Sequence, residues 1–261
     1  MKNLILHVIL FLSFSKGETV CKKDDKFFND AKHFLSNEGF KSQEIIQGNN
    51  SKSSTLFEGA RGRKIFVNVV SFINEGDKLT FAWKLSLFDA LSDKYRTPHI
   101  SSCFIFDQTV FLFRIIGMEE SILSQDIFRN LEIGDKLALY SRIAIVFADI
   151  NDKGGWFYGR HYQHIIIPSG EVKHAIFLEF NSIKEINHPS MKIEKMMMIS
   201  KYGTEEKAKL HYPKRLFINF ITKFELSRIS DPQKYTRSRM PYELAELLYN
   251  IDKLDITLRD I

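Results

Sequence analysis

The pattern of apolar residues changes at Gly117, and this change limits the possible fold more than any other feature of the sequence. Before Gly117, several short segments rich in β-branched and aromatic residues are typical of strands. After it, the segment 135–153 carries apolar residues at helical spacing over its whole length. The sequence therefore predicts an α+β fold in which a small antiparallel sheet precedes a mainly helical part.

The individual elements follow from the same periodicities. In the first part we predict helices at 27–40 and 79–91, and strands from Ile45 onward at 55–57, 65–72, 102–107 and 109–116. In the second part we predict helices at 122–128 and 135–153, and short strands at 156–158, 165–167 and 175–178. For 181–261 we predict irregular structure with helical pieces only near 216–224 and 242–249.

The N-terminus has the pattern of a secretory signal peptide. A basic start at Lys2 precedes the apolar run 4–14, and the small or turn-forming residues Ser15 and Gly17 follow it. A transmembrane helix needs about 20 apolar residues, so this run is too short to span a bilayer. We expect 1–17 to be a signal peptide and the mature protein to be secreted without stable membrane insertion; the alternative is a buried N-terminal helix.

The two cysteines, Cys21 and Cys103, are far apart in the sequence. An oxidising compartment would allow them to pair, but two thiols do not make a disulfide framework. Because Cys103 begins the apolar run 103–106, we favour a buried, unpaired thiol there.

Positive charge is concentrated between Lys184 and Arg215. The chain has a net charge of +5, and this segment contains eight basic and four acidic side chains. Such a segment is typical of a solvated loop, and it can also contact an acidic protein surface or an anionic membrane. No aromatic residues alternate regularly with these lysines as a stacking groove would require, so we expect no nucleic-acid partner.

Three stretches resemble protein kinases when taken with the order of the predicted elements. Residues 65–70 resemble the third kinase strand, 95–100 resemble the turn after the small-lobe helix, and 157–172 with 179–181 resemble the catalytic loop, hairpin and metal-binding motif. With its signal peptide, aromatic-rich sheet and altered motifs, the chain is similar to the secreted rhoptry kinases and pseudokinases of apicomplexan parasites.

The resemblance implies a division of the chain into four parts. Residues 1–17 are the signal peptide, 18–42 an N-terminal helical extension, 43–117 a kinase-like small lobe and 118–261 a partial large lobe. Residues 238–243 resemble the end of a kinase activation segment, and only a handful of residues follow. This implies a truncated large lobe, so we expect the apolar face of 135–153 to be partly exposed.

The nucleotide site implied by the resemblance has lost its usual residues. Asn49, Ser51 and Ser54 stand where the phosphate loop would have glycines, and Asn68 replaces the lysine that grips the phosphates. No glutamate lies between 79 and 95 to pair with such a lysine. The alternative is that Lys52 or Lys64 reaches the phosphates instead.

The implied catalytic loop is altered in the same way. Arg160 stands at the position of the catalytic aspartate, Tyr162 at that of the following lysine and Ile165 at that of the metal-binding asparagine. Arginine cannot act as a base at neutral pH. Glu179 stands at the metal-binding aspartate and is a weak candidate for Mg²⁺, without a partner ligand at Ile165.

These substitutions predict a protein that binds and does not catalyse. We expect a secreted pseudokinase without ATP or metal cofactor that acts on host proteins or partner kinases, in the rhoptry or in a host cell. The alternative is an atypical ATP-binding protein kinase with substituted catalytic residues.

Overall fold

The computed structural model divides the chain into two compact units, Met1–Glu120 with Leu178–Asn181, and Ser121–Phe177 with Ser182–Ile261. The signal peptide predicted at 1–17 lies outside the described residues. Within those residues, no helix is long and apolar enough to cross a membrane. The described residues are 21–23, 27–41, 45, 54–59, 62–72, 75–92, 100–106, 108–117, 119–158, 165–177, 183–226 and 242–261.

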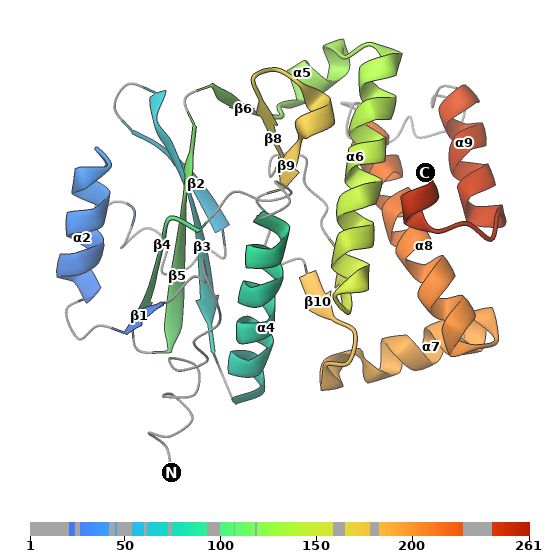
Figure 1. Ribbon diagram of the computed structural model, residues 1–261, viewed down its shortest axis with the longest axis horizontal. Coiled ribbons are helices and arrows are strands. Elements are labelled where there is room, and N and C mark those ends of the chain that lie inside the picture. Colours follow the sequence, from blue (N-terminus) through green and yellow to red (C-terminus); the bar gives the residue numbers. More distant parts are fainter. Residues whose placement is uncertain are drawn as a thin grey trace. The chain divides into compact units, whose positions relative to one another are not determined.

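The first unit contains a five-stranded sheet with the strand order β1-β4-β5-β3-β2 (Figure 1). The edge strand β1 runs parallel to β4, and the other neighbouring strands are antiparallel. The strands are β1 (Lys22–Lys23), β2 (Ser54–Glu58), β3 (Lys64–Ser71), β4 (Ser102–Phe106) and β5 (Thr109–Ile116). Their positions confirm the strands predicted from the sequence at 55–57, 65–72, 102–107 and 109–116.

Helices α2 (Phe27–Asn37) and α4 (Glu75–Ser92) cover opposite faces of this sheet (Figure 1). Side chains alternate between the two faces of a strand. Ile65, Val67 and Val69 of β3 therefore share one face, and they join the apolar cluster that includes residues of α2. Both sides of the central strands are buried, which explains why their sequences are almost continuously apolar.

A disulfide joins Cys21 to Cys103, so the preference for an unpaired Cys103 was wrong. The parallel pairing of β1 with β4 sets Lys22 beside Phe104 and brings the two cysteine Cα atoms to 4.5 Å. That distance lies within the range a disulfide spans. The cysteines are 82 residues apart, so only the pairing of two strands distant in sequence could reveal the bond.

The second unit is mainly helical and contains two small sheets with the orders β6-β8-β9 and β10-β7. Its helices are α5 (Gln125–Asn130), α6 (Ile133–Asp152), α7 (Lys192–Tyr202), α8 (Glu205–Leu226) and α9 (Tyr242–Lys253). Its strands are β6 (Glu120–Ile122), β7 (Gly155–Phe157), β8 (Ile165–Pro168), β9 (Ile176–Phe177) and β10 (Ile183–Glu185). The antiparallel pair β8 and β9 confirms the two short strands predicted after the long helix.

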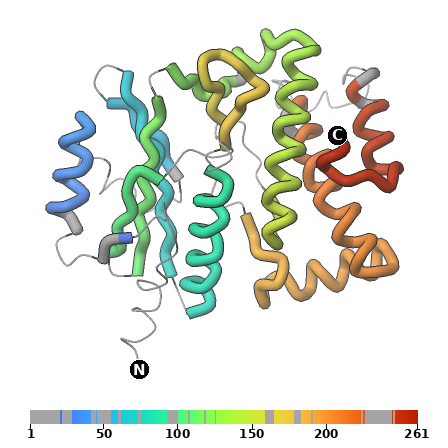
Figure 2. Tube along the Cα trace, viewed as in Figure 1, coloured from blue at the N-terminus to red at the C-terminus, as the bar shows by residue number. Residues whose placement is uncertain are grey.

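The long helix α6 is the centre of the core of the second unit. Figure 2 shows α8 beside it, although the two helices are far apart in sequence, and they are in contact. Phe147 of α6 meets Phe217 and Phe220 of α8 edge-on, at ring distances of 6.0 and 5.6 Å. The expected exposure of the apolar face of 135–153 is therefore wrong for most of the helix, because α8 covers it.

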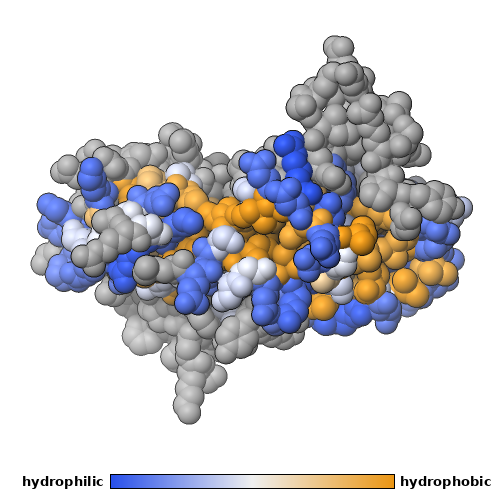
Figure 3. All heavy atoms as spheres, turned by 90° about the horizontal axis from the view of Figure 1, so that it is seen from above, coloured by the Kyte–Doolittle hydropathy of each residue, from blue (hydrophilic) through white to orange (hydrophobic). Residues whose placement is uncertain are grey.

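Within α6, large apolar side chains are exposed only near the start of the helix. Leu137 is 42% exposed, and Ile127 of α5 and Ile133 are also exposed. Figure 3 views the molecule from above Figure 1 and shows hydrophobic residues among hydrophilic ones on that face.

Two predictions for the second unit need correction. The helix predicted at 122–128 begins only at Gln125, because β6 ends at Ile122 and the Ser124 side chain caps the new helix by accepting a hydrogen bond from the amide of Ile127. The helical pieces predicted near 216–224 and 242–249 are confirmed by α8 and α9, but the irregular structure predicted for the rest of 181–261 is wrong for 192–202 and 205–215, which form α7 and the first part of α8. Pro213 and the many lysines obscure the pattern of α8, whose stability comes from packing on α6.

The basic segment from Lys184 to Arg215 is consequently not a solvated loop. Most of it lies in α7 and α8. Lys214 is fully buried, and its ammonium donates a hydrogen bond to the carbonyl of Leu254 at 2.5 Å. Burial lowers the pKa of this lysine. The charge of the segment is therefore divided between a core residue and surface residues of two helices.

Candidate functional site

The structure brings together two of the residues predicted to mark the altered nucleotide site. Ser54 of β2 stands directly opposite Asn68 of β3 in the antiparallel ladder. Asn49 and Ser51, predicted for the same site, lie outside the described residues. The described part of the candidate site is therefore the end of the β2–β3 ladder at which Ser54 and Asn68 meet.

Asn68 belongs to the core of the first unit. Its side chain is fully buried, and its Oδ1 accepts a hydrogen bond from Nη1 of Arg114 at 2.5 Å. Arg114 lies opposite Phe66 in the ladder, one step diagonally from Asn68 on the same face of the sheet. The strand position predicted to correspond to the phosphate-binding lysine of kinases thus holds a neutral amide that is hydrogen-bonded to a buried arginine.

Arg114 is the buried partner of Asn68, and the sequence analysis did not identify it. It is fully buried, and its guanidinium carbon lies 4.5 Å from the ring centre of Phe88 in α4. A cation over an aromatic face is stabilised by the ring's quadrupole, more strongly when both are removed from water. The single arginine within the apolar strand 109–116 was a signal of this arrangement, because a charge is almost never fully buried without a partner. Arg114 therefore links β3, β5 and α4.

Ile165 stands in β8 and is almost fully buried. It pairs with Phe177 of β9 in an antiparallel ladder. An alkyl side chain has no atom that can bind Mg²⁺, which takes oxygen ligands. The position predicted for the metal-binding asparagine therefore belongs to the packed interior.

The strands that flank the predicted catalytic loop and the predicted metal motif are paired. Phe157, near the C-terminal end of β7, is opposite Ile183, the first residue of β10. Arg160 and Tyr162 follow β7 in sequence and Glu179 precedes β10, and all three lie outside the described residues. The register shows that the two predicted motifs are attached to neighbouring ends of one two-stranded sheet.

A hydrogen-bonded cluster of two tyrosines and one glutamate lies close to this sheet. Tyr158 donates to Oε1 of Glu194 at 2.8 Å, Tyr212 donates to the same oxygen, and the two phenol oxygens are 3.3 Å apart. The Lys184 ammonium lies 4.9 Å from the ring centre of Tyr158. The cluster joins the segment after β7 to both α7 and α8.

Burial is the main reason that both tyrosine hydroxyls hold their protons tightly. It raises the pKa of Tyr158, and the hydrogen bonds to Tyr212 and Glu194 raise that pKa further. Burial also raises the pKa of Tyr212, and its bond to Glu194 adds to the effect. Both phenols are therefore neutral donors at physiological pH, suited to fixing the position of α7 and unsuited to acting as bases.

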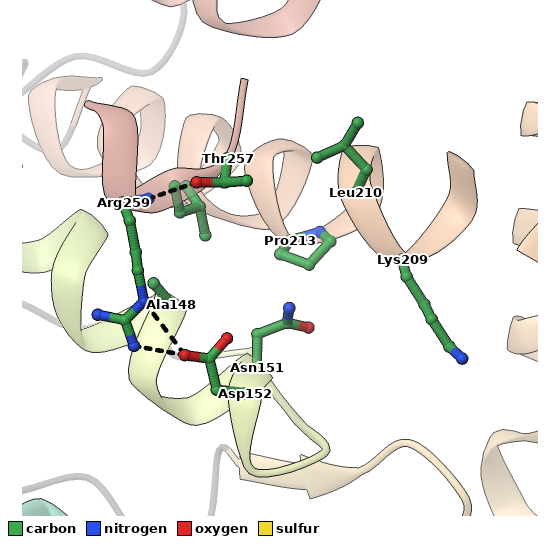
Figure 4. Close-up of a pocket in the computed structure, with 9 residues that line it drawn as sticks. Ala148, Asn151, Asp152, Lys209, Leu210, Pro213, Thr257 and Arg259 are labelled. Carbon is green, nitrogen blue, oxygen red and sulfur yellow. Dashed lines mark hydrogen bonds and ion pairs between the residues drawn. The ribbon is translucent and has the colours of Figure 1, made fainter. Parts of the chain in front are cut away.

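A small pocket lies between α6, α8 and the C-terminal 3₁₀ helix η7 (Leu258–Asp260), as Figure 4 shows. Arg259 closes one side of it by an ion pair to Asp149 at 2.7 Å and a second ion pair to Asp152. The volume of about 140 Å³ is below the 300 Å³ or more of typical ligand pockets. The pocket lining is Ala148, Asn151, Asp152, Lys209, Leu210, Pro213, Thr257, Leu258 and Arg259.

Metal binding has no support in the described part of the chain. There, no group of three or more histidine, cysteine, aspartate or glutamate side chains is placed to hold a metal ion. The weak candidate Glu179 lies outside this part.

Comparisons with known proteins give matches only at the level of structure. No family model and no curated protein matches the sequence. The chain is similar to the solved twitchin kinase region from C. elegans, with 9% identity over 78% of this chain and a TM-score of 0.43. It is also similar to a C. elegans twitchin kinase fragment described as an autoregulated protein kinase with immunoglobulin domains, with 10% identity over 94% of this chain and a TM-score of 0.47. The chain spans 42% and 59% of the lengths of these two structures.

Proposed function

We propose that this chain is a kinase-like protein that transfers no phosphoryl group and acts by binding another protein. The observation that carries the proposal is the fully buried Asn68, bonded to Arg114 at the position where the kinase resemblance requires a lysine that binds phosphates. An amide in the core offers a triphosphate no charge. Arg114 is itself fully buried, so it does not replace the missing ammonium at a surface site.

The order of elements supports the kinase-like part of the proposal. Helix α4 lies between β3 and β4 in sequence, and the sheet is followed by the long helix α6, strand β7 and the pair β8–β9. This is the order of a kinase small lobe and the beginning of a large lobe. The pairing of β7 with β10 further supports it, since the predicted loop and metal motif then start from neighbouring strand ends.

The chemistry of phosphoryl transfer supports the inactive part of the proposal. Catalysis by kinases consists of positioning and charge neutralisation, which need a lysine, an aspartate base and metal ligands. Here the corresponding residues are Asn68, Arg160 and Ile165. A general base alone contributes about 10²–10⁴-fold to a rate, so the combined losses take turnover below detection.

The proposal extends to secretion. The Cys21–Cys103 disulfide favours an oxidising compartment, because disulfides are rare in reducing ones. This agrees with the signal peptide inferred at 1–17 and with a role toward host proteins or partner kinases, as the resemblance to rhoptry pseudokinases implies.

The test is the thermal stability of the purified chain with ATP and Mg²⁺. A ligand at roughly 100 times its Kd adds about 2.7 kcal/mol to a native state that alone binds it. For a chain of this size that gain would raise Tm by about 5–10 °C. We expect no such rise, whereas an active protein kinase measured in parallel as a control should show one.

A phosphotransfer assay on a generic protein substrate completes the test. We expect no incorporation of phosphate by the natural chain or by the Glu179→Ala variant. A rise in Tm with ATP that Lys64→Met abolishes, or phosphorylation that Glu179→Ala abolishes, would establish the atypical kinase instead.

A further inference from the structure

Helix α7 presents an apolar face to solvent. Ile193 is 74% exposed, and Met196 and Met197 are each 61% exposed. Their spacing of three and four residues places them on one side of the helix. None of the residues in α7 is buried, and the helix lies at the edge of the second unit (Figure 1). Because α7 packs against the unit by its opposite side, this apolar face is free to contact another molecule.

Two lysines mark the ends of this face. Lys192 and Lys201, at the start and near the end of α7, are both exposed. They are nine residues apart, which corresponds to about 13 Å along a helix. Nine residues are also about two and a half helical turns, so the two lysines flank the apolar face on opposite edges, one toward each end of the helix.

The other charges of α7 are used within the unit. Glu194 accepts the hydrogen bonds of Tyr158 and Tyr212. Lys195 forms an ion pair with Glu205 at 2.9 Å. The single carboxylate of the helix is therefore engaged, and it does not neutralise the lysines at the ends of the exposed face.

We propose that the outer face of α7, formed by Ile193, Met196 and Met197 between Lys192 and Lys201, docks an amphipathic helix of a partner protein. The complementary helix carries apolar side chains in its middle and carboxylates about 13 Å apart at its ends. Methionine side chains suit such a contact because they are flexible and polarisable. The inference rests on the proposed binding function and names the chemistry of the partner.

The charges of this face argue against two other occupants, a second copy of the chain and an anionic membrane. In a second copy of the chain, whether parallel or antiparallel, a lysine at one end of α7 would face a lysine of its partner, and like charges repel. Attraction to an anionic membrane is worth about 1 kcal/mol per lysine, and stable recognition takes clusters of roughly four to eight basic residues. The outer face of α7 has two lysines.

The experiment measures binding of a designed helical peptide to the full secreted chain by fluorescence anisotropy. The probe is a fluorescein-labelled peptide with leucines at helical spacing between two glutamates nine residues apart, and a scrambled peptide of equal composition is its control. One face of an 11-residue helix makes a small interface, so we expect a Kd of roughly 10–100 µM. The Kd should increase as the salt concentration rises.

Substitutions test each part of the face. Met196→Glu combined with Met197→Glu should weaken binding at least tenfold. Leu79→Glu is the matched control, because Leu79 is 67% exposed on α4 of the other unit, and it should leave the Kd unchanged. Lys192→Glu combined with Lys201→Glu should abolish binding of this peptide and create binding of a peptide with lysines in place of its glutamates.

Several results would overturn the proposal. The first two are equal binding of the designed and scrambled peptides, and a double lysine variant that does not change its preference to the lysine-containing peptide. The other two are binding to phosphatidylserine vesicles that Met196→Glu abolishes, and a dimer in sedimentation that Met196→Glu dissociates. None of these readouts depends on nucleotide. If the designed peptide does not bind and ATP does not raise Tm, only the docking surface on α7 is rejected. If ATP raises Tm, the proposed function itself is rejected.

Discussion

At the scale of single residues, the core of the first unit depends on one buried cation. Arg114 donates to Asn68 and lies over the ring of Phe88, and all three side chains are essentially excluded from solvent. A charge held in this way requires its polar neighbour to remain an acceptor. The identity of residue 68 is therefore set by the stability of the fold.

Replacing Asn68 by lysine should destabilise the protein and should not restore nucleotide binding. The new ammonium would lie beside the buried guanidinium, so we expect the free energy of unfolding to fall by about 3 kcal/mol or more. Asn68→Asp is the matched control, because it keeps an acceptor for Arg114 and should cost at most about 1 kcal/mol. Urea denaturation measures both losses; equal stability of the lysine variant and the natural chain would contradict this account.

The tyrosine cluster predicts a loss of stability in alkaline solution. Burial raises the pKa of Tyr158 and Tyr212, whereas an unfolded tyrosine ionises near pH 10. Above about pH 10 the native state thus binds more protons than the unfolded state, so stability is complete below that pH and falls as the pH rises. Near-ultraviolet absorbance should show that at least two tyrosines form phenolates only at a higher pH or when the chain unfolds.

Glu194→Gln tests the cause within the cluster. It keeps an oxygen acceptor and removes the negative charge, so the pKa of both tyrosines should fall and the loss of stability above pH 10 should be less steep. Glu206→Gln, at an exposed position of α8, is the control and should change neither quantity. Titration of all tyrosines near pH 10 in the folded natural chain would refute the prediction.

At the scale of elements, the edge strand β1 is held by a covalent bond as well as by pairing. It has two residues and runs parallel to β4, so its ladder alone contributes little. The disulfide between Cys21 and Cys103 joins residues 82 apart in sequence. A cross-link of this span mainly limits the freedom of the unfolded chain.

Removing this bond should lower the free energy of unfolding by about 2–4 kcal/mol. The variant is Cys21→Ser with Cys103→Ala, since a serine hydroxyl at the buried position 103 would add a separate cost. Denaturation with and without a reducing agent checks the assignment. Reduction should destabilise the natural chain and leave the double variant unchanged; alkylation of both cysteines in the native chain without reductant would disprove the bond.

The sequence predicted some helices of the second unit and missed others. Helix α6 was predicted within two residues of its bounds, because its apolar residues repeat at helical spacing throughout. Helix α7 was missed because its apolar residues are exposed and form no buried stripe. Helical periodicity of apolar residues indicates a helix side that packs into the core, whereas the apolar side of α7 faces solvent.

At the scale of the whole molecule, positive charge and exposed apolar side chains occur in the same part of the chain. The net charge of +5 is concentrated in a segment that forms α7 and α8, which also carry the tyrosine cluster and the exposed apolar face. At this scale the proposed loss of the phosphate-binding and catalytic residues predicts that ATP with Mg²⁺ leaves Tm unchanged. An absent response to ATP with a selective response to the acidic helical peptide would establish a binding protein.

The sequence by itself determined the α+β class and the strands of the main sheet, since these depend on local periodicity and on strand-forming residues. The placing of Asn68 and Ile165 at phosphate- and metal-binding positions stays a prediction that the kinase resemblance implies. Only the tertiary structure decided the bond between Cys21 and Cys103, the burial of Arg114 and the cover of α6 by α8. Each of these is a contact between residues distant in sequence, and such a contact depends on how strands and helices pair in space, which no local pattern specifies.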